Sequence, residues 1–191
     1  MIVVKTLMLK TAKGMPLKEV SEMNVSPDGV ADTVPCLPQR QILLLPTSTL
    51  TEFNLQPGNL RENILIEGHD LHSLESGTVI SIGDVDIRLT YHCEPCIKMK
   101  SFGSVKNLLH KRGYFGTFLN SGHIHTGDEV IIREKRFESI PYDIKDRIRW
   151  YLDHQTGPVS IPQLCYGVGL SRGYYRAIPG MLKRMERSLV R

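Results

Sequence analysis

The spacing of the apolar residues changes once along this chain. In the longer first part they form short β-rich runs bounded by Gly, Asp or Pro. In the last part they recur at helical spacing, as Ile144, Ile148 and Leu152 do. The pattern predicts a mostly β fold, an antiparallel β-barrel over residues 1–139, followed by a small α-helical bundle over residues 140–191.

Within the predicted barrel, two Gly-Asp pairs mark hairpin turns, because both residue types tolerate positive φ. They are Gly83-Asp84 and Gly127-Asp128. Near the second pair, His123 and His125 would lie on one face of a strand. That placement permits metal binding or phosphate contact, although surface histidines beside a turn are commoner. The predicted strands are Val3–Leu9, Gln41–Leu45, Val79–Ile82, Val85–Leu89 and Glu129–Arg133, and short connecting helices are predicted at Thr47–Asn54 and Ser104–Lys111.

In the last part, residues suited to helix ends divide the chain. Asp143 caps the first predicted helix, and Ser160 caps the second. Gly169 ends the second helix and Ser171 caps a third. Pro179-Gly180 is predicted to interrupt the chain before a final helix, Met181–Leu189.

Composition limits the class of protein. With 41% hydrophobic and 23% charged residues, the chain resembles a soluble globular protein. No apolar run approaches the roughly 20 residues of a membrane-spanning helix. The first residues also lack a secretory signal pattern, so we expect a cytoplasmic protein with no membrane partner. In a reducing compartment the four cysteines, Cys36, Cys93, Cys96 and Cys165, are expected to be thiols.

Several short phrases in the first part are not explained by strand periodicity. In chain order they include Pro57–Ile64, Gly68–Leu71, Cys93–Cys96 and Gly113–Gly116. The ordered set resembles the MOSC family, the domain found at the C-terminus of molybdenum-cofactor sulfurases and as stand-alone bacterial proteins. The resemblance covers about residues 1–133. It implies a β-barrel of the pyruvate-kinase-barrel type that binds a molybdenum-pterin cofactor or carries sulfur on a cysteine.

The resemblance assigns the chemistry to Cys96, because the family's key cysteine ends the phrase matched by Cys93–Cys96. A thiolate suits molybdenum as a ligand and is the right nucleophile to carry a sulfane sulfur. Lys98 lies close enough in sequence to favour the thiolate, and Cys93 is the expected packing residue. A zinc site or a thioredoxin-like pair are alternatives for C-x-x-C. The first needs a second pair, and the second needs a helix N-terminus within a βαβ unit.

Four more residues complete the implied cofactor site: Asp32, Arg61, Glu62 and Asn63. Arg61 stands where the family phrase usually has glycine. Glu62 and Asn63 would hydrogen-bond the pterin, or alternatively cap a turn. Asp32 fits a family segment that often continues to a histidine, which this chain lacks. We expect Asp32, Glu62, Asn63 and Cys96 to meet at one mouth of the barrel.

The last part is basic and suggests a different partner. Residues 140–191 hold 9 Lys+Arg against 4 Asp+Glu, whereas residues 1–139 hold 15 against 16. The segment Gln163–Ile178 fits a helix-turn-helix pattern. Tyr142–Leu182 resembles the helical DNA-binding part of the alkylguanine alkyltransferases. That family's Pro-Cys-His-Arg motif is absent, which excludes alkyl transfer.

The second resemblance implies a nucleic-acid contact. In the alkyltransferases an arginine fills the space of a flipped base, and Arg176 is the matching position. We therefore expect Arg172, Tyr174 and Arg176 to face outward and to contact DNA. The alternative is a helical tail that only covers the barrel and exposes its arginines to solvent.

Three functions follow from these patterns. The first is a molybdenum-cofactor oxidoreductase that reduces N-hydroxylated small molecules, with Cys96 as metal ligand. The second is a sulfur carrier or transferase that holds a persulfide on Cys96 and exchanges sulfur with a donor or acceptor protein. The third is a nucleic-acid-binding protein whose barrel is a sensor. Pyridoxal phosphate is linked to the family only through fusions to a separate lyase domain.

Overall fold

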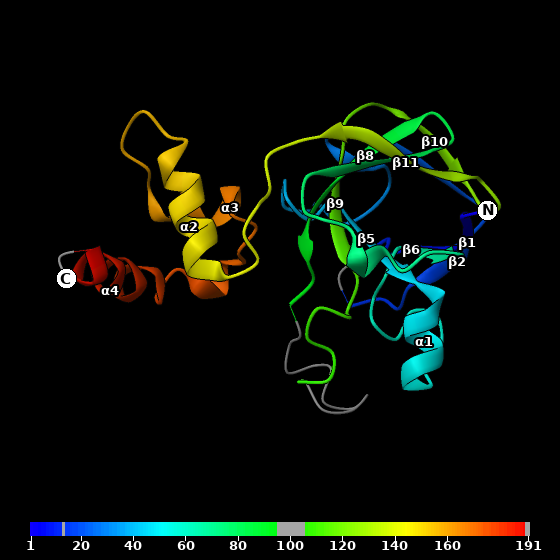
Figure 1. The fold of residues 1–191 in the computed structure, drawn as a ribbon, viewed down its shortest axis with the longest axis horizontal. Helices are drawn as coiled ribbons and strands as arrows, with labels where there is room; N and C mark the ends of the chain where they lie inside the picture. Colours follow the sequence, from blue (N-terminus) through cyan, green and yellow to red (C-terminus); the bar gives the residue numbers. More distant parts are fainter. Residues whose placement is uncertain (13, 95–105, 190–191) are drawn as a thin grey trace.

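The computed structural model describes residues 1–12, 14–94 and 106–189, and shows a strand-rich body followed by helices (Figure 1). The strands are β1 (Val3–Leu9), β2 (Lys18–Val20), β3 (Glu22–Ser26), β4 (Gly29–Val30), β5 (Ile42–Pro46), β6 (Ile64–Glu67), β7 (Thr78–Ile82), β8 (Val85–His92), β9 (Tyr114–Phe118), β10 (Gly122–His125) and β11 (Val130–Arg136). The helices are α1 (Thr47–Phe53), α2 (Ile144–Asp153), α3 (Ile161–Gly167) and α4 (Ile178–Leu189), with short 3₁₀ turns η1 (Leu71–Ser73) and η3 (Arg172–Tyr174).

The described strands form two sheets. The larger has the order β11-β7-β8-β9-β5-β6-β1-β2, and the smaller has the order β10-β3-β4. Neighbouring strands run antiparallel except β5 and β6, which pair in parallel with Leu44 opposite Ile64. The larger sheet curls into a half-barrel (Figure 1). The predicted mostly β, largely antiparallel barrel is therefore confirmed, as are the five strands predicted from apolar runs.

The barrel is closed further by the first strand. A β-bridge joins Val3 to Glu129, just before β11. Val4 N–H donates to the Asp128 carbonyl at 2.9 Å, and Val130 N–H donates to the Ile2 carbonyl at 2.8 Å. These bonds bring the start of β1 to the turn between β10 and β11, where Gly127 takes the positive φ predicted for it.

The sheet curls around one apolar core. Alternate residues of β8 point inward, so Val85, Ile87 and Leu89 are fully buried. Gly116 in β9 leaves space for the core, since a Cβ there would lie 2.6 Å from the Ile87 Cγ2 atom. The alternation of side chains across the strands thus produces a filled interior.

The ends of α2 and α3 agree with the predicted caps. The Asp143 carboxylate accepts a hydrogen bond from Lys145 N–H at 2.8 Å. Ser160 and Gln163 form a capping box, with Pro162 in the first turn of α3. Gly169 follows α3 with a φ of 71°, which supports its predicted role in ending that helix.

The prediction of a third helix that begins after Ser171 is wrong. Ser171 makes no side-chain cap bond, and Arg172–Tyr174 form only a 3₁₀ turn. The long last helix begins at Ile178, so Pro179-Gly180 lie in its first turn and do not interrupt the chain. Proline is tolerated there because the first N–H groups of a helix have no partner within it. The described part of the predicted helix Ser104–Lys111 is also wrong, because residues 106–111 form turns.

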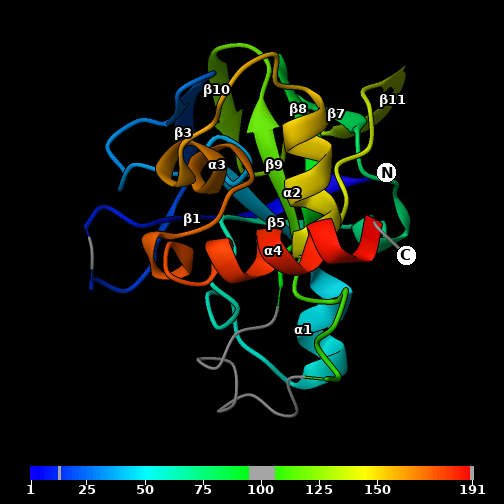
Figure 2. The ribbon, with the colours of Figure 1, turned by 90° about the vertical axis from the view of Figure 1, so that its left-hand side faces the viewer.

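The helices α2, α3 and α4 gather on one side of the half-barrel (Figure 1), the side that faces the viewer in Figure 2. They have their own apolar cluster, which includes Ile148, Leu164, Val168 and Ile178. This cluster is separate from the core inside the barrel, and the predicted boundary near residue 139 falls between β11 and α2. None of the described helices combines the length and apolar character that membrane crossing requires.

Candidate functional site

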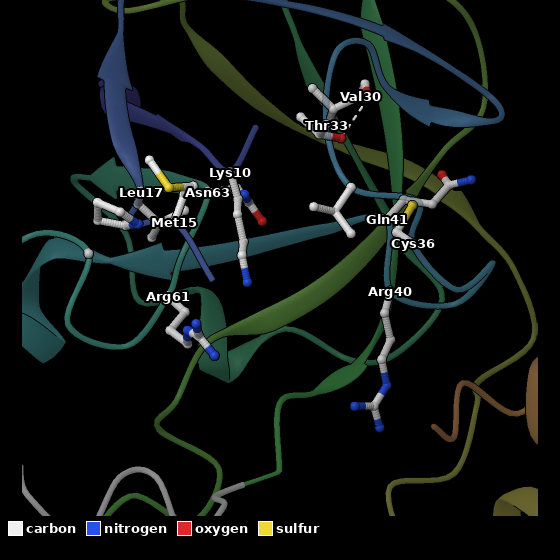
Figure 3. Close-up of a pocket in the computed structure, with 13 residues that line it drawn as sticks. Lys10, Met15, Leu17, Val30, Thr33, Cys36, Arg40, Gln41, Arg61 and Asn63 are labelled. Carbon is white, nitrogen blue, oxygen red and sulfur yellow. Dashed lines mark hydrogen bonds between the residues drawn. The ribbon is translucent and has the colours of Figure 1, made fainter. Parts of the chain in front are cut away.

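A cavity of about 400 Å³ opens among the segments that follow β1 and β4 and those that precede β5 and β6 (Figure 3). A volume of this size is ordinary for small-molecule sites. Its chemically useful lining residues are Lys10, Cys36, Arg40, Gln41, Arg61 and Asn63.

The lining is cationic. It holds Lys10, Arg40 and Arg61, and no aspartate or glutamate of the described chain lines it. Figure 3 shows Lys10 and Arg61 extending toward the same space from opposite segments. Neither of these two forms an ion pair with any residue in the described ranges. Two unpaired cations and an absence of described carboxylates make this cavity suited to an anionic ligand.

Arg61 is held in an unusual backbone conformation, with a φ of 65°. This left-handed region favours glycine, because the Cβ of other residues crowds the backbone there. The conformation gives a physical reason for the glycine that usually precedes Glu and Asn in the matching family phrase. In this chain the residue instead brings a guanidinium to the cavity.

Arg40 links the cavity to the Cys93–Cys96 phrase. Its Nη2 atom donates to both carboxylate oxygens of Glu94, at 3.0 and 2.8 Å. Its Nε atom donates to the Tyr91 hydroxyl at 2.9 Å. Glu94 is the second residue of that phrase, so the start of the phrase lies beside a cavity residue.

Cys36 also lines the cavity, although no motif in the sequence marks it as a site residue. Its half-buried thiol lies beside Gly29, where a Cβ would come within 3.0 Å of the sulfur. Burial raises the pKa of this thiol, and a backbone hydrogen bond partly offsets the rise. Its position in the segment that departs from the family pattern, Thr33–Cys36, was the available signal.

Glu62 lies outside the cavity lining. Its side chain is fully buried, and Oε1 accepts a hydrogen bond from Gly58 N–H. Burial raises the pKa of the carboxyl, while backbone hydrogen bonds and Arg112 oppose the rise. The contact with Gly58 favours the turn-capping alternative for Glu62.

Asn63 lines the cavity, but its amide is already engaged. Its Oδ1 atom accepts from Leu43 N–H at 3.0 Å, and Nδ2 donates to the Met8 carbonyl at 3.1 Å. The side chain therefore ties β1 to β5 near the cavity. Asp32 is exposed and has a φ of 56°, and it does not line the cavity, although its neighbour Thr33 does.

The assigned cysteine cannot be placed, because Cys96 and Lys98 lie outside the described residues. Cys93 is buried, in agreement with its predicted packing role. The expected meeting of Asp32, Glu62, Asn63 and Cys96 therefore stays a prediction as a whole. Among its described members, Asn63 lines the cavity and Glu62 and Asp32 flank it.

The other predicted contacts are distributed over the surface. His123 and His125 stack on one face of β10, as expected, and both lie near Glu22. No group of metal-ligating side chains suited to a metal ion occurs in the described ranges. Arg172 and Arg176 are exposed, whereas Tyr174 is half-buried against the helical cluster.

Comparisons with known proteins agree with this architecture. The family model for the MOSC domain matches residues 36–131. The YUAD protein from Bacillus subtilis has a similar structure, with a TM-score of 0.60 and 18% identity, over 72% of this chain and 98% of that chain. YiiM from Geobacillus stearothermophilus has a TM-score of 0.59 and 14% identity, covering 95% of this chain and 100% of that one.

A third structure extends the same likeness. YiiM from Escherichia coli has a TM-score of 0.56 and 16% identity, over 97% of this chain and 94% of that chain. No curated protein sequence matches significantly. At these identities the structures show a shared fold, and the family model spans half of the sequence. The chain therefore belongs to the MOSC domain family.

Proposed function

We propose that this chain binds the molybdenum cofactor in the cationic cavity and uses it to reduce N-hydroxylated small molecules. The observation that carries the proposal is that two cations, Lys10 and Arg61, line a cavity in which no described residue supplies a carboxylate. The molybdenum cofactor carries a phosphate and a planar pterin, so it is an anion of the size class that such a cavity accepts.

The described residues fit this cofactor in distinct ways. Lys10 and Arg61 would hold the phosphate, because ammonium and guanidinium groups form charge-assisted hydrogen bonds with phosphate oxygens. Thr33 also lines the cavity, and its hydroxyl, which donates to the Val30 carbonyl, can accept a hydrogen bond from the polar edge of a pterin. The Gln41 amide is already bonded to Pro27, Thr117 and Phe118. When bound, the cofactor supplies a two-electron redox centre, and the chain binds and orients it.

Cys96 is the proposed metal ligand, with Lys98 favouring its thiolate. The salt bridge between Glu94 and Arg40 supports this assignment, since it fixes the start of the Cys93–Cys96 phrase against the cavity wall. Cys96 is only two residues beyond Glu94 in the sequence, so a short length of chain would separate it from a cofactor bound in the cavity.

Cofactor loading is the direct test. The protein is purified from a host that makes the cofactor, and molybdenum and released pterin are both quantified. Cys96→Ser is expected to lose molybdenum, and Lys10→Ala is expected to lose both molybdenum and pterin. Cys93→Ser and the surface variant Lys18→Ala are the matched controls. A wild-type protein without molybdenum, or Cys96→Ser with a full complement, would contradict the proposal.

Replacing Arg61 by glycine should separate stability from binding. Arg61→Gly relieves the left-handed strain and is expected to raise the free energy of unfolding by about 1 kcal/mol. The same change removes a cavity cation, so less pterin should be retained. Urea unfolding and pterin content measure the two effects. Arg61→Ala is the control, because it removes the charge but keeps a Cβ in the strained conformation. Equal stabilities of the two variants would contradict the strain argument.

The sulfur-carrier alternative uses the same cysteine. It is favoured if purified protein contains no pterin but carries a persulfide that Cys96→Ser removes. Mass spectrometry of the intact, unreduced chain detects the additional sulfur. The cationic cavity would then serve an anionic sulfur acceptor.

Contact with DNA is a second candidate function. Arg172 and Arg176 are exposed and form no ion pair within the described chain. Such arginines support salt-dependent contact with phosphates. Duplex DNA titrated at low salt should bind wild type more tightly than Arg172→Ala/Arg176→Ala. Lys183→Ala/Arg184→Ala, which removes the same charge from α4, is the control, and equal weakening by both pairs would contradict a specific role.

A further inference from the structure

We infer that Arg147, from helix α2, adds to the positive charge of the cavity wall by sharing the Glu94 carboxylate with Arg40. The helical part would thereby set the affinity of the barrel cavity for anions. This inference rests on the proposed function only in treating the cavity as an anion site.

Glu94 lies between two guanidinium groups from different parts of the fold. Arg40, beside β5, binds both of its carboxylate oxygens. Arg147 Nη2 donates to Oε1, one of the same two oxygens. The Glu94 side chain is 23% exposed and that of Arg147 is 0% exposed. One carboxylate therefore serves two cations at a largely buried junction.

Arg147 is held in place and cannot turn away to solvent. Its guanidinium carbon lies 3.7 Å from the centroid of the Tyr91 ring, in a cation–π contact. Its Nε and Nη1 atoms are buried and have no hydrogen-bond partner among the described residues. A buried cation needs a counter-charge, and Glu94 is the carboxylate within reach.

The charge balance follows from this arrangement. With Arg147 present, the two arginines and Glu94 carry a net charge of +1. Without Arg147, Arg40 and Glu94 form a neutral pair, and the cavity wall loses one positive charge. An anion near Arg40 is attracted to the net charge of the group and not to Arg40 alone.

A second contact from the helical part fixes Arg40 itself. The Tyr91 hydroxyl accepts from Arg40 Nε and donates to the Val168 carbonyl, which follows α3, at 3.3 Å. Tyr91 therefore packs against α2 through its ring and against the end of α3 through its hydroxyl. Both contacts couple the orientation of the cavity arginine to the helices.

The test uses Cys36 as an electrostatic reporter in protein prepared without cofactor. The pH dependence of its alkylation by iodoacetamide, followed site by site with mass spectrometry, gives the pKa of the thiol. Arg147→Met should raise this pKa by about half a unit, because a less positive wall stabilises the thiolate less. Arg149→Met, which removes the same charge from the exposed face of α2, should leave it unchanged.

A paired substitution separates charge from packing. Glu94→Gln/Arg147→Met restores the net charge of +1 and should return the Cys36 pKa to the wild-type value. Glu94→Gln alone leaves two uncompensated arginines and should lower it. A double variant that behaves like Arg147→Met would overturn the inference in favour of simple loss of packing. If Arg147→Met does not fold, the Cys36 pKa is compared between Glu94→Gln and the double variant, because these two differ only at Arg147 and so by the same single charge.

Binding of inorganic phosphate at low salt provides a second readout. Arg147→Met should weaken it by a factor of about three, on the same electrostatic scale, and the double variant should restore it. Unchanged affinity and unchanged Cys36 pKa in Arg147→Met would refute the inference. Neither measurement involves the cofactor, so a failure of cofactor loading with an intact Cys36 pattern would refute the proposed function alone.

Discussion

Replacing Gly169 by alanine is expected to lower the free energy of unfolding by about 3 kcal/mol, because it adds a clash to a strained backbone. Gly169 has a φ of 71°, where a Cβ is unfavourable. That Cβ would also lie 2.1 Å from the Tyr91 hydroxyl oxygen. Relief requires Tyr91 to move, which breaks its bonds to the Val168 carbonyl and to Arg40. Urea unfolding measures the change.

Gly127→Ala is the matched control for this prediction. Gly127 also has a positive φ, of 93°, but no atom lies within 4 Å of the added Cβ. Gly127→Ala should therefore lower the free energy of unfolding only by the backbone strain, about 1 kcal/mol. If Gly169→Ala costs no more than Gly127→Ala, then close packing of the helices on Tyr91 does not stabilise the fold.

Acid should destabilise this protein through a cluster of histidines. His92 ends β8, and its Nδ1 atom lies 3.1 Å from the Nδ1 atom of His110. Burial, together with His72 and His110, lowers the pKa of His92 to about 4. The unfolded chain therefore binds more protons at His92 than the folded chain between pH 6.5 and about 4. Stability from this group is present above that window and is lost as the pH falls through it.

The measurement is urea unfolding at several pH values across this window. His92→Gln should flatten the loss of stability relative to wild type, since the titrating group is removed. His72, whose pKa burial also lowers, contributes with the same sign. His154→Gln is the control, because a hydrogen bond to the Trp150 carbonyl raises the pKa of His154. Parallel curves for wild type and His92→Gln would contradict the prediction.

The strands that could be predicted are those with strong local signals. β7 and β8 follow from apolar runs joined by Gly83-Asp84, which also fixes their hairpin. β3 was missed, because Met23 and Val25 alternate with polar residues over only five positions. Its partner β10 has a single buried residue, Ile124, so its pairing with β3 depends on tertiary contacts.

The site was predictable only in part, for a related reason. The ordered phrases identified Arg61 as a departure from the family, and the positive φ at this position explains why glycine is usual there. Lys10 and Arg40 carry no sequence signal, because separate segments bring them to one cavity. Arg147 was least visible, since helical periodicity places it only at the edge of the apolar stripe of α2, where an arginine is usually exposed to solvent. Its burial results from packing against Tyr91, which the period of one helix cannot indicate.

The tie between the first strand and residues 127–130 has a consequence for how the chain folds. β1 pairs with β6 some sixty residues later, but the remaining backbone bonds of Ile2 and Val4 within the described chain go to Gly127, Asp128 and Val130. During synthesis the first strand cannot form its hydrogen bonds to residues 127–130 until almost all of the barrel has left the ribosome. Long-range closure of this kind slows folding. Lys10 directly follows that strand, so the element that brings a cation to the cavity gains its last hydrogen bonds late, and full affinity for a ligand should follow completion of the barrel.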